Sequence, residues 1–180
     1  SPIVSINKMP RLLASLKQAN ELILVIDNPQ NAMMLNQLGL AHHSRINVLV
    51  DIDGGIGRTG VGFNEALSFG RYLNTLPGLK LRGIQCYAGH LQHVQDYQER
   101  RTQSLAVMTQ AAKIRQLFID AKLDAGILTG TGTGTYDIDV DAGVSEIQPG
   151  SYVVMDVEYG HIGSKTKHNA FNDFACAMHL

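Results

Sequence analysis

Residues 128–136 read Leu-Thr-Gly-Thr-Gly-Thr-Gly-Thr-Tyr and continue an apolar run that starts at Ala125. Small residues that alternate with glycine leave the backbone N–H groups accessible, so such a loop can close around an anion. A second glycine turn, Gln-Pro-Gly-Ser, follows at 148–151. Runs of this composition also form plain flexible connections, but threonine hydroxyls that donate hydrogen bonds and two such turns at successive strand ends favour a phosphate. Because ligand loops of parallel α/β proteins collect at the carboxyl ends of strands, the stretch predicts that class of fold.

The rest of the chain alternates short apolar runs with longer segments of helical spacing. The expected strands are 22–27, 46–53, 81–88, 125–129 and 147–157, and the expected helices are 9–19, 29–40, 63–76 and 95–122. Such alternation predicts a parallel sheet with right-handed crossovers. The runs at 23–26 and 46–50 are apolar at every position except Asn47, as in strands that are covered on both faces. We therefore expect an α/β fold, a (β/α)8 TIM-type barrel.

The chain is shorter than a whole barrel of this kind. A complete (β/α)8 barrel needs about 250 residues, and 180 are present. The segment Ile3-Val4-Ser5 resembles the end of a strand, and residues 174–180 form an apolar run without a polar tail. We expect residues 1–180 to be part of a barrel domain, without its first strands and without whatever follows Leu180.

Composition narrows the class of partner. The chain is 44% hydrophobic and 17% charged with a net charge of −1, so no electrostatic pattern points to nucleic acid or to an acidic membrane. It has no apolar run of membrane-spanning length and no signal-peptide pattern at its start. Cys86 and Cys176 lie in apolar stretches without metal-ligand spacing, which is typical of buried thiols in a reducing compartment. We expect a cytoplasmic location.

A second glycine pattern, G-x-G-x-x-G, lies at 55–60 and is also found in dinucleotide sites. Asp51 and Asp53 place negative charge where a pyrophosphate would lie, and the next predicted strand ends without an acid for the ribose. The two aspartates and the missing acid therefore argue against dinucleotide binding, although the glycine spacing matches. Arg58 in this loop has two interpretations: it contacts a cofactor, or it pairs with Asp51 or Asp53 inside the barrel mouth.

An aromatic ring and an imidazole follow one predicted strand closely. Tyr87 ends the run at 81–88, and His90 comes three residues later. His90 is a candidate general base or metal ligand, or a hydrogen-bonded structural residue. The aspartates at 137, 139 and 141 are typical of loop and helix-cap chemistry. We predict no metal-ligand set within the chain.

Four segments together resemble a known family: 50–61, 83–90, 129–136 and 146–156. Their order and spacing are similar to those of the D-threonine aldolase and D-serine dehydratase-like family, which belongs to the alanine-racemase-type, fold type III pyridoxal-phosphate enzymes. The resemblance implies a barrel domain followed by a C-terminal β domain, pyridoxal 5'-phosphate as cofactor, and a homodimer.

The resemblance also implies roles for individual residues. Both glycine turns would hold the cofactor phosphate, while a ring and a guanidinium contact the pyridine. The cofactor-binding residues on this basis are Arg58, Tyr87, Thr129, Gly132, Thr133, Gln148, Gly150 and Ser151. Gln148 falls where alanine racemases carry an arginine at the pyridine nitrogen, which leaves the protonation state of the ring open.

Two parts of the family's machinery have no match in the chain. The Schiff-base lysine of the family lies on the first barrel strand, and the seven lysines here are all expected in helices or loops. The family's divalent metal is bound by the C-terminal β domain. The resemblance therefore implies that these 180 residues alone are inactive.

The function implied by the resemblance is that of a pyridoxal-phosphate-dependent lyase acting on D-amino acids. Aldol cleavage of D-threonine-like β-hydroxy amino acids is the first expectation, and a metal would acidify the hydroxyl whose proton is removed, with His90 as a candidate to assist. Amino-acid racemisation and D-serine dehydration on the same barrel are alternatives. A non-catalytic pyridoxal-phosphate carrier and a phosphosugar-binding barrel are further alternatives.

Overall fold

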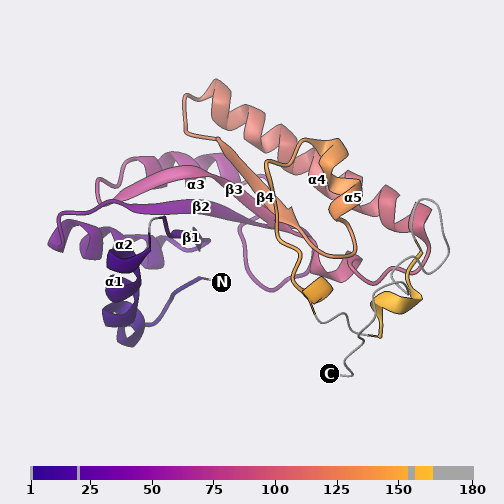
Figure 1. Cartoon of the computed structure of the whole chain (residues 1–180). Helices are drawn as coiled ribbons and strands as arrows, with labels where there is room; N and C mark the ends of the chain where they lie inside the picture. The colour runs from indigo at the N-terminus through magenta and orange to yellow at the C-terminus, as the bar shows by residue number, and fades with distance from the viewer. Residues whose placement is uncertain (1, 20, 154–156, 164–180) are drawn as a thin grey trace.

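Five parallel strands form a single sheet in the computed structural model, which describes residues 2–19, 21–153 and 157–163 (Figure 1). The strands follow the order of the chain: β1 (Ile23–Ile26), β2 (Ile46–Asp53), β3 (Leu79–Tyr87), β4 (Ile127–Thr131) and β5 (Glu146–Ile147). Every neighbouring pair is parallel. Sequential parallel strands joined through helices are the pattern of a TIM-type barrel, as predicted.

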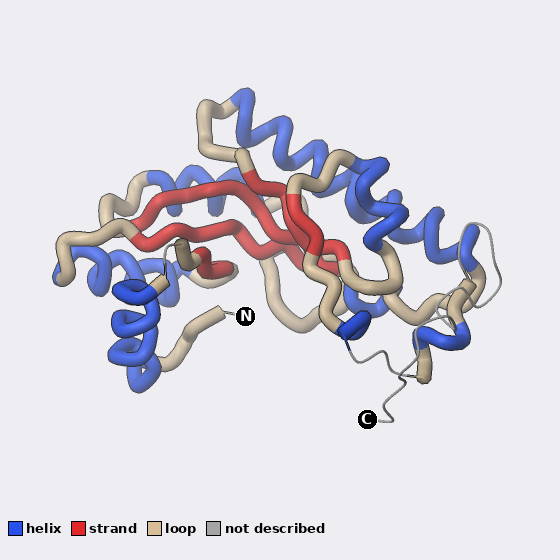
Figure 2. The backbone as a smooth tube through the Cα atoms, viewed as in Figure 1, coloured by secondary structure: helices blue, strands red, loops and turns tan. Residues whose placement is uncertain are grey.

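Helices connect the strands and cover one face of the curved sheet (Figure 2). The α-helices are α1 (Met9–Gln18), α2 (Pro29–Ala41), α3 (Ala66–Asn74), α4 (Tyr97–Asp120) and α5 (Tyr136–Asp139). Short 3-10 helices are η1 (Ile6–Lys8), η2 (Gly89–Leu91), η3 (Val140–Ala142), η4 (Ser151–Val153) and η5 (Tyr159–His161). Asn28 caps α2 and Asp96 caps α4 through their side chains. Among the described residues, no helix combines the length and apolarity that crossing a membrane requires.

The two faces of the sheet carry separate apolar clusters. Side chains such as Ile26, Val50 and Ile84 join the main core with α2, α3 and α4. On the other face, Val25, Leu49 and Ile127 form a small cluster of their own. Side chains alternate between the two faces of a strand. Residues two positions after Val25, Leu49 and Ile127 along each strand therefore also point to this second, concave face.

The strand register places a layer of polar side chains next to the apolar cluster on the concave face. Val25 pairs with Leu49, and Leu49 is linked through Gly83 to Ile127. Two residues closer to the carboxyl ends, Asp51 pairs with Gln85 and Gln85 with Thr129. The concave face is therefore apolar in its middle and polar toward the carboxyl ends of β2, β3 and β4.

The strands around the glycine turns differ from the prediction. The expected strand 125–129 is β4, which begins at Ile127 and continues to Thr131, within the glycine run. Gly130 permits this because its φ is 154°, and a Cβ atom there would collide with the Cys86 carbonyl of the neighbouring strand. The prediction of a continuous strand at 147–157 is wrong, since the strand here is Glu146–Ile147 and the described residues 148–153 are loop and η4. Pro149 has no N–H for the ladder, and residues 154–156 lie outside the described residues.

Other local predictions were also corrected. Residues 2–5 form a loop and not the end of a strand. Lys80 lies in β3, not in a helix or loop, at the amino end of that strand. Cys86 is fully buried, as predicted, and burial raises the pKa of its thiol to about 12. Cys176 and the run 174–180 lie outside the described residues.

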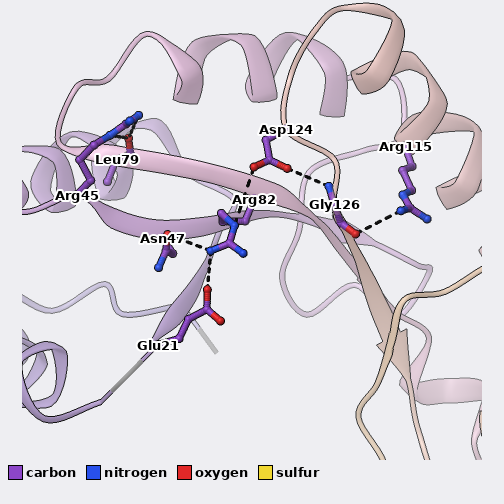
Figure 3. Close-up of polar contacts among 8 residues, drawn as sticks. All are labelled: Glu21, Arg45, Asn47, Leu79, Arg82, Arg115, Asp124 and Gly126. Atoms are coloured by element: carbon purple, nitrogen blue, oxygen red, sulfur yellow. Dashed lines mark hydrogen bonds and ion pairs between the residues drawn. The ribbon is translucent and has the colours of Figure 1, made fainter.

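Paired polar groups lie near the amino ends of the strands, and we call this set the amino rim (Figure 3). Its side chains are those of Glu21, Arg45, Asn47, Arg82, Arg115 and Asp124. Arg82 Nη1 lies 2.5 Å from Glu21 Oε1, and Arg82 Nε lies 4.0 Å from Asp124 Oδ2. Arg45 donates to the Leu79 carbonyl, and Arg115 donates to the Gly126 carbonyl at 3.2 Å. The amino rim thus connects adjacent strands through its own ion pairs and hydrogen bonds.

Candidate functional site

A cavity of about 190 Å³ lies at the carboxyl ends of β2 and β3. Its lining includes Arg58, Tyr87 and Gln148, three of the residues predicted to bind a cofactor, together with Pro2, Val25, Asp51, Thr59 and Gln85. A larger cavity of about 510 Å³ lies on the helix side, between α2 and α3, and contains none of the predicted residues. The strand ends therefore bring a guanidinium, an aromatic ring and an amide into one small polar space.

Hydrogen bonds join the polar layer beneath this cavity. Asp51 accepts from Thr59 Oγ1 at 2.8 Å and from Gln85 Nε2 at 3.1 Å. Gln148 Nε2 donates to Gln85 Oε1 at 3.0 Å and to Thr129 Oγ1 at 2.9 Å. We call Asp51, Gln85 and Gln148 the amide relay. Burial raises the pKa of Asp51, and the hydrogen bonds from Thr59 and Gln85 oppose that shift.

Three backbone N–H groups of the loop at 54–60 donate to carboxylates at the ends of β1 and β2. Gly55 N–H and Gly57 N–H donate to Asp53 Oδ1 at 2.9 and 3.1 Å, and these bonds hold the pKa of Asp53 below its ordinary value. Gly60 N–H donates to Asp27 Oδ2 at 3.0 Å. Carboxylates thus occupy the donors that a dinucleotide would need, which supports the sequence argument. Arg58, in the same loop, is exposed and forms no ion pair with any residue that the structure describes.

The glycine run leaves one hydroxyl without a partner. Thr133 is 2% exposed, and its Oγ1 has no hydrogen-bond partner among the described residues. Thr135 Oγ1 lies 2.8 Å from Thr131 Oγ1 and 3.4 Å from the Gly132 nitrogen. An unsatisfied buried hydroxyl costs free energy, so Thr133 is a candidate donor to a ligand. A Cβ atom on Gly132 would lie 3.2 Å from the Tyr87 ring, which places the run beside that ring.

Two buried side chains, not predicted from the sequence, hold the glycine run. Gln92 Oε1 accepts from Gly134 N–H at 2.9 Å, and Gln92 Nε2 donates to Thr135 Oγ1 at 3.1 Å. Arg100 Nε donates to the Gly134 carbonyl at 2.8 Å, and its other nitrogens donate to the carbonyls of Val94 and Gly163. Arg100 is 1% exposed, and burial lowers its pKa. Gly134 is therefore fixed through both its N–H and its carbonyl, and a Cβ there would collide with Gln92.

The second glycine turn follows the strand next to the first. Gln148 N–H donates to the Thr131 carbonyl at 2.8 Å, so the chain after β5 lies beside the end of β4. Gly150 is exposed, and the half-buried Ser151 begins η4. The two predicted anion loops thus leave adjacent strands.

Other candidates lie apart from the cavity. His90 is exposed in η2, and its ring lies beside Gly55, where a Cβ atom would be 3.2 Å from His90 Cε1; it does not line the cavity. Asp139 accepts from Ser104 Oγ at 2.6 Å, and Asp141 pairs with Arg101, which are structural roles. In the described part of the chain, no group of three or more histidine, cysteine, aspartate or glutamate side chains is placed to hold a metal.

Successive parallel strands with glycine loops and a polar cavity at their carboxyl ends define a barrel-type domain with a site for a small polar ligand. Residues 1–157 match the alanine racemase N-terminal domain family, and the chain belongs to that family. Together with the relatives described next, this match confirms the resemblance to the D-threonine aldolase-like, fold type III pyridoxal-phosphate family.

Individual relatives support the same family. The chain is 33% identical over 151 residues to a D-threonine aldolase of Arthrobacter sp, covering 83% of this chain and 40% of that protein. It is 31% identical over 157 residues to a 3-hydroxy-D-aspartate aldolase of Paracoccus denitrificans (strain Pd 1222), covering 86% and 41%. The crystal structure of D-threonine aldolase from Filomicrobium marinum aligns with a TM-score of 0.82 and 29% identity over 98% of this chain and 47% of that one. The chain thus spans about 40% of the length of these curated relatives.

Proposed function

We propose that this chain is the cofactor-binding part of a pyridoxal-phosphate-dependent lyase that cleaves D-configured β-hydroxy amino acids by an aldol reaction. Family membership and the two aldolase relatives support this proposal. The observation that carries it is the cavity where Arg58, Tyr87 and Gln148 meet above the polar layer of the sheet.

The side chains at this site fit the proposed cofactor. Arg58 has only donors and would neutralise a negative oxygen of the cofactor. Tyr87 offers a flat face for the pyridine ring. Thr133 Oγ1, buried and without a partner among the described residues, would donate to the phosphate, and Gly132, Gly150 and Ser151 would add donors from the two turns. Thr129 already accepts from Gln148, so its role would be to support that amide.

The bound cofactor supplies an electron-withdrawing ring that stabilises negative charge at the substrate Cα. The residues of this chain would hold that ring in place and would balance its charges. Among the described lysines, Lys80 is on a strand but at the amino end, opposite the cavity. We propose that the Schiff-base lysine lies elsewhere in the full-length enzyme.

The remaining features of the proposed enzyme come from the family resemblance. We propose that residues 1–180 belong to a barrel domain, and that a C-terminal β domain supplies the ligands of a divalent metal. The described residues contain no such ligand group. A cytoplasmic homodimer with a small D-amino acid as substrate completes the proposal.

The test uses the full-length protein. We expect the purified protein to bind pyridoxal phosphate, seen by its absorbance, and to release glycine from D-threonine or 3-hydroxy-D-aspartate but not from the L-isomers. Ammonia with an oxo acid would instead indicate a dehydratase, and inversion of D-amino acids would indicate a racemase. Cofactor binding without turnover would indicate a carrier. A protein that takes up no pyridoxal phosphate would contradict the proposal and its alternatives that use this cofactor.

A further inference from the structure

One end of the amide relay has a fixed hydrogen-bond polarity. Both oxygens of Asp51 accept, from Thr59 Oγ1 and from Gln85 Nε2, as an ionised carboxylate must. Because Gln85 turns its Nε2 toward Asp51, its Oε1 faces Gln148. Gln148 must then donate its own Nε2–H to Gln85 Oε1, at 3.0 Å. The carboxylate therefore determines the orientation of both amides, which geometry alone would leave ambiguous.

This polarity decides what Gln148 can offer to a ligand. Its Nε2 has two hydrogens, and they are used by Gln85 Oε1 and Thr129 Oγ1. Its Oε1 accepts from none of the residues that the structure describes, and Gln148 is exposed and lines the cavity with Arg58. We propose that Gln148 is a hydrogen-bond acceptor for the bound ligand, and that Asp51 enforces this through Gln85.

The acceptor selects one protonation state of the cofactor. This inference rests on the proposed function, because it concerns the same cavity. The phosphate and phenolic oxygens of pyridoxal phosphate carry negative charge and suit donors such as Arg58. The ring nitrogen donates a hydrogen bond only when it is protonated, and it is then the partner that an acceptor requires. Gln148 therefore holds a proton on the ring nitrogen, and a protonated ring withdraws electrons more strongly than a neutral one.

The experiment measures the protonation of the ring nitrogen directly. Full-length protein is loaded with pyridoxal phosphate labelled with ¹⁵N in the ring, and the ¹⁵N chemical shift is followed against pH. We expect the protonated shift in the wild type at neutral pH. Gln148→Arg still donates to Gln85 and Thr129 but offers only N–H groups to the cavity, so we expect the unprotonated shift with the cofactor still bound. Gln148→Leu removes the acceptor, and we expect a proton affinity at least about tenfold lower, one pKa unit.

Two further variants test the relay. Asp51→Asn introduces an amide that can either donate to Gln85 or accept from it, so the orientation of the Gln85 and Gln148 amides is no longer fixed. We expect the proton affinity of the ring nitrogen to lie between those of the wild type and Gln148→Arg. Gln116→Leu is the matched control, since this exposed amide on α4 donates its side-chain hydrogen bond to Asp120, away from the cavity, and we expect the wild-type shift. If Gln148→Arg does not bind the cofactor, Gln148→Leu and Asp51→Asn give the same comparison.

The outcomes separate this inference from the proposed function. A wild-type protein that binds the cofactor with an unprotonated ring nitrogen would overturn the inference and leave the function in place. An unchanged shift in Gln148→Leu and Asp51→Asn would do the same. Failure of the wild type to bind pyridoxal phosphate would overturn both.

Discussion

The two ends of the same sheet differ in how they use their polar groups. At the amino rim, the guanidinium groups of Arg45, Arg82 and Arg115 all have partners within the protein (Figure 3). At the carboxyl ends, Arg58 has no ion pair and Thr133 Oγ1 has no hydrogen bond within the described residues. The contrast teaches that one end of a parallel sheet can supply stability while the other keeps donors and acceptors for a ligand.

The largest expected effect comes from removing the support beneath the carboxyl ends. Arg100→Met leaves the carbonyls of Gly134, Val94 and Gly163 without their donor. Hydrogen bonds to a charged group contribute about 1.5–3 kcal/mol each, and the cost of burying the guanidinium offsets part of their sum. We therefore expect a net loss of about 3–5 kcal/mol in the free energy of unfolding, measured by urea titration. The neighbouring Arg101, whose side chain is 42% exposed and pairs with Asp141 at 3.2 Å, is the control; Arg101→Met should change stability by about 0.5 kcal/mol or less. Equal effects of the two substitutions would contradict the role given to Arg100.

The second prediction removes the guanidinium at the carboxyl ends. Arg58→Met should leave the free energy of unfolding unchanged, because Arg58 is exposed and has no ion pair among the described residues. The affinity for pyridoxal phosphate should fall by about 10–100-fold, since a charge-assisted hydrogen bond contributes about 1.5–3 kcal/mol. Equilibrium titration of the cofactor by absorbance gives the answer. Lower stability with unchanged affinity would show that the two ends of the sheet do not differ as described.

The third prediction concerns the buried hydroxyl of the glycine run. Thr133→Val replaces an unpartnered Oγ1 with a methyl group of similar size, so the free protein should be as stable as the wild type or up to about 1 kcal/mol more stable. Affinity for inorganic phosphate and for pyridoxal phosphate should fall by about 3–10-fold, the size of one lost hydrogen bond. Calorimetric titration measures the affinity, and thermal unfolding measures the stability. A destabilised variant with full affinity would mean that Thr133 has a structural partner instead.

The fourth prediction is the counterpart at the amino rim. Arg82→Met removes the contacts with Glu21 and Asp124, which are partly exposed, and should cost about 0.5–1 kcal/mol of stability. Cofactor affinity should stay at the wild-type value, because the cavity lies at the other end of the strands. The same urea and absorbance titrations apply. Any loss of affinity greater than that of Arg58→Met would break the comparison.

The smallest effect is the pH dependence contributed by Asp51. Its pKa is raised in the folded protein, so the folded state holds this proton more tightly than the unfolded state does. The free energy of unfolding should therefore fall as pH rises from the ordinary carboxyl pKa, about 3.9, to the raised value of Asp51, and the penalty persists above it. Asp51→Asn removes this dependence, so the stability of the wild type relative to the variant should be greatest at acid pH. Parallel curves for the two proteins would show that the pKa of Asp51 is not raised.

The sequence predicts the regular elements where a single periodic signal dominates. The expected strand at 46–53 is β2 itself, because a short and mostly apolar run is typical of a strand that is covered on both faces. The helix expected at 95–122 is α4 to within two residues at each end. The prediction of a strand at 147–157 was wrong because its apolar residues lie on both sides of Pro149. Proline has no N–H to donate, so it ends the hydrogen bonding between β4 and β5. Apolar composition alone does not show whether backbone donors are present.

The supporting side chains of the site were harder to predict, because Gln85, Gln92 and Arg100 belong to residue types that are usually exposed. A signal for Arg100 does exist in the helical period of α4. The buried positions of that helix are Tyr97, Arg100, Ser104, Met108, Ala111, Ile114 and Phe118. Arg100 therefore belongs to the apolar stripe despite its charge. For Gln85, the signal is the period of two that places it on the same face as Tyr87.

The loop at 54–60 binds an anion that belongs to the same chain, the carboxylate at the end of β2. Asp53 is tethered beside the amides of Gly55 and Gly57, and a free phosphate must displace a group whose effective concentration is far higher than its own. The anion-binding N–H groups of the G-x-G-x-x-G loop, which we call its nest, are thus occupied by a side chain of the protein itself. A search by glycine spacing alone would assign this protein to nucleotide binding, while the aspartate two residues before Gly55 shows that the nest is already filled.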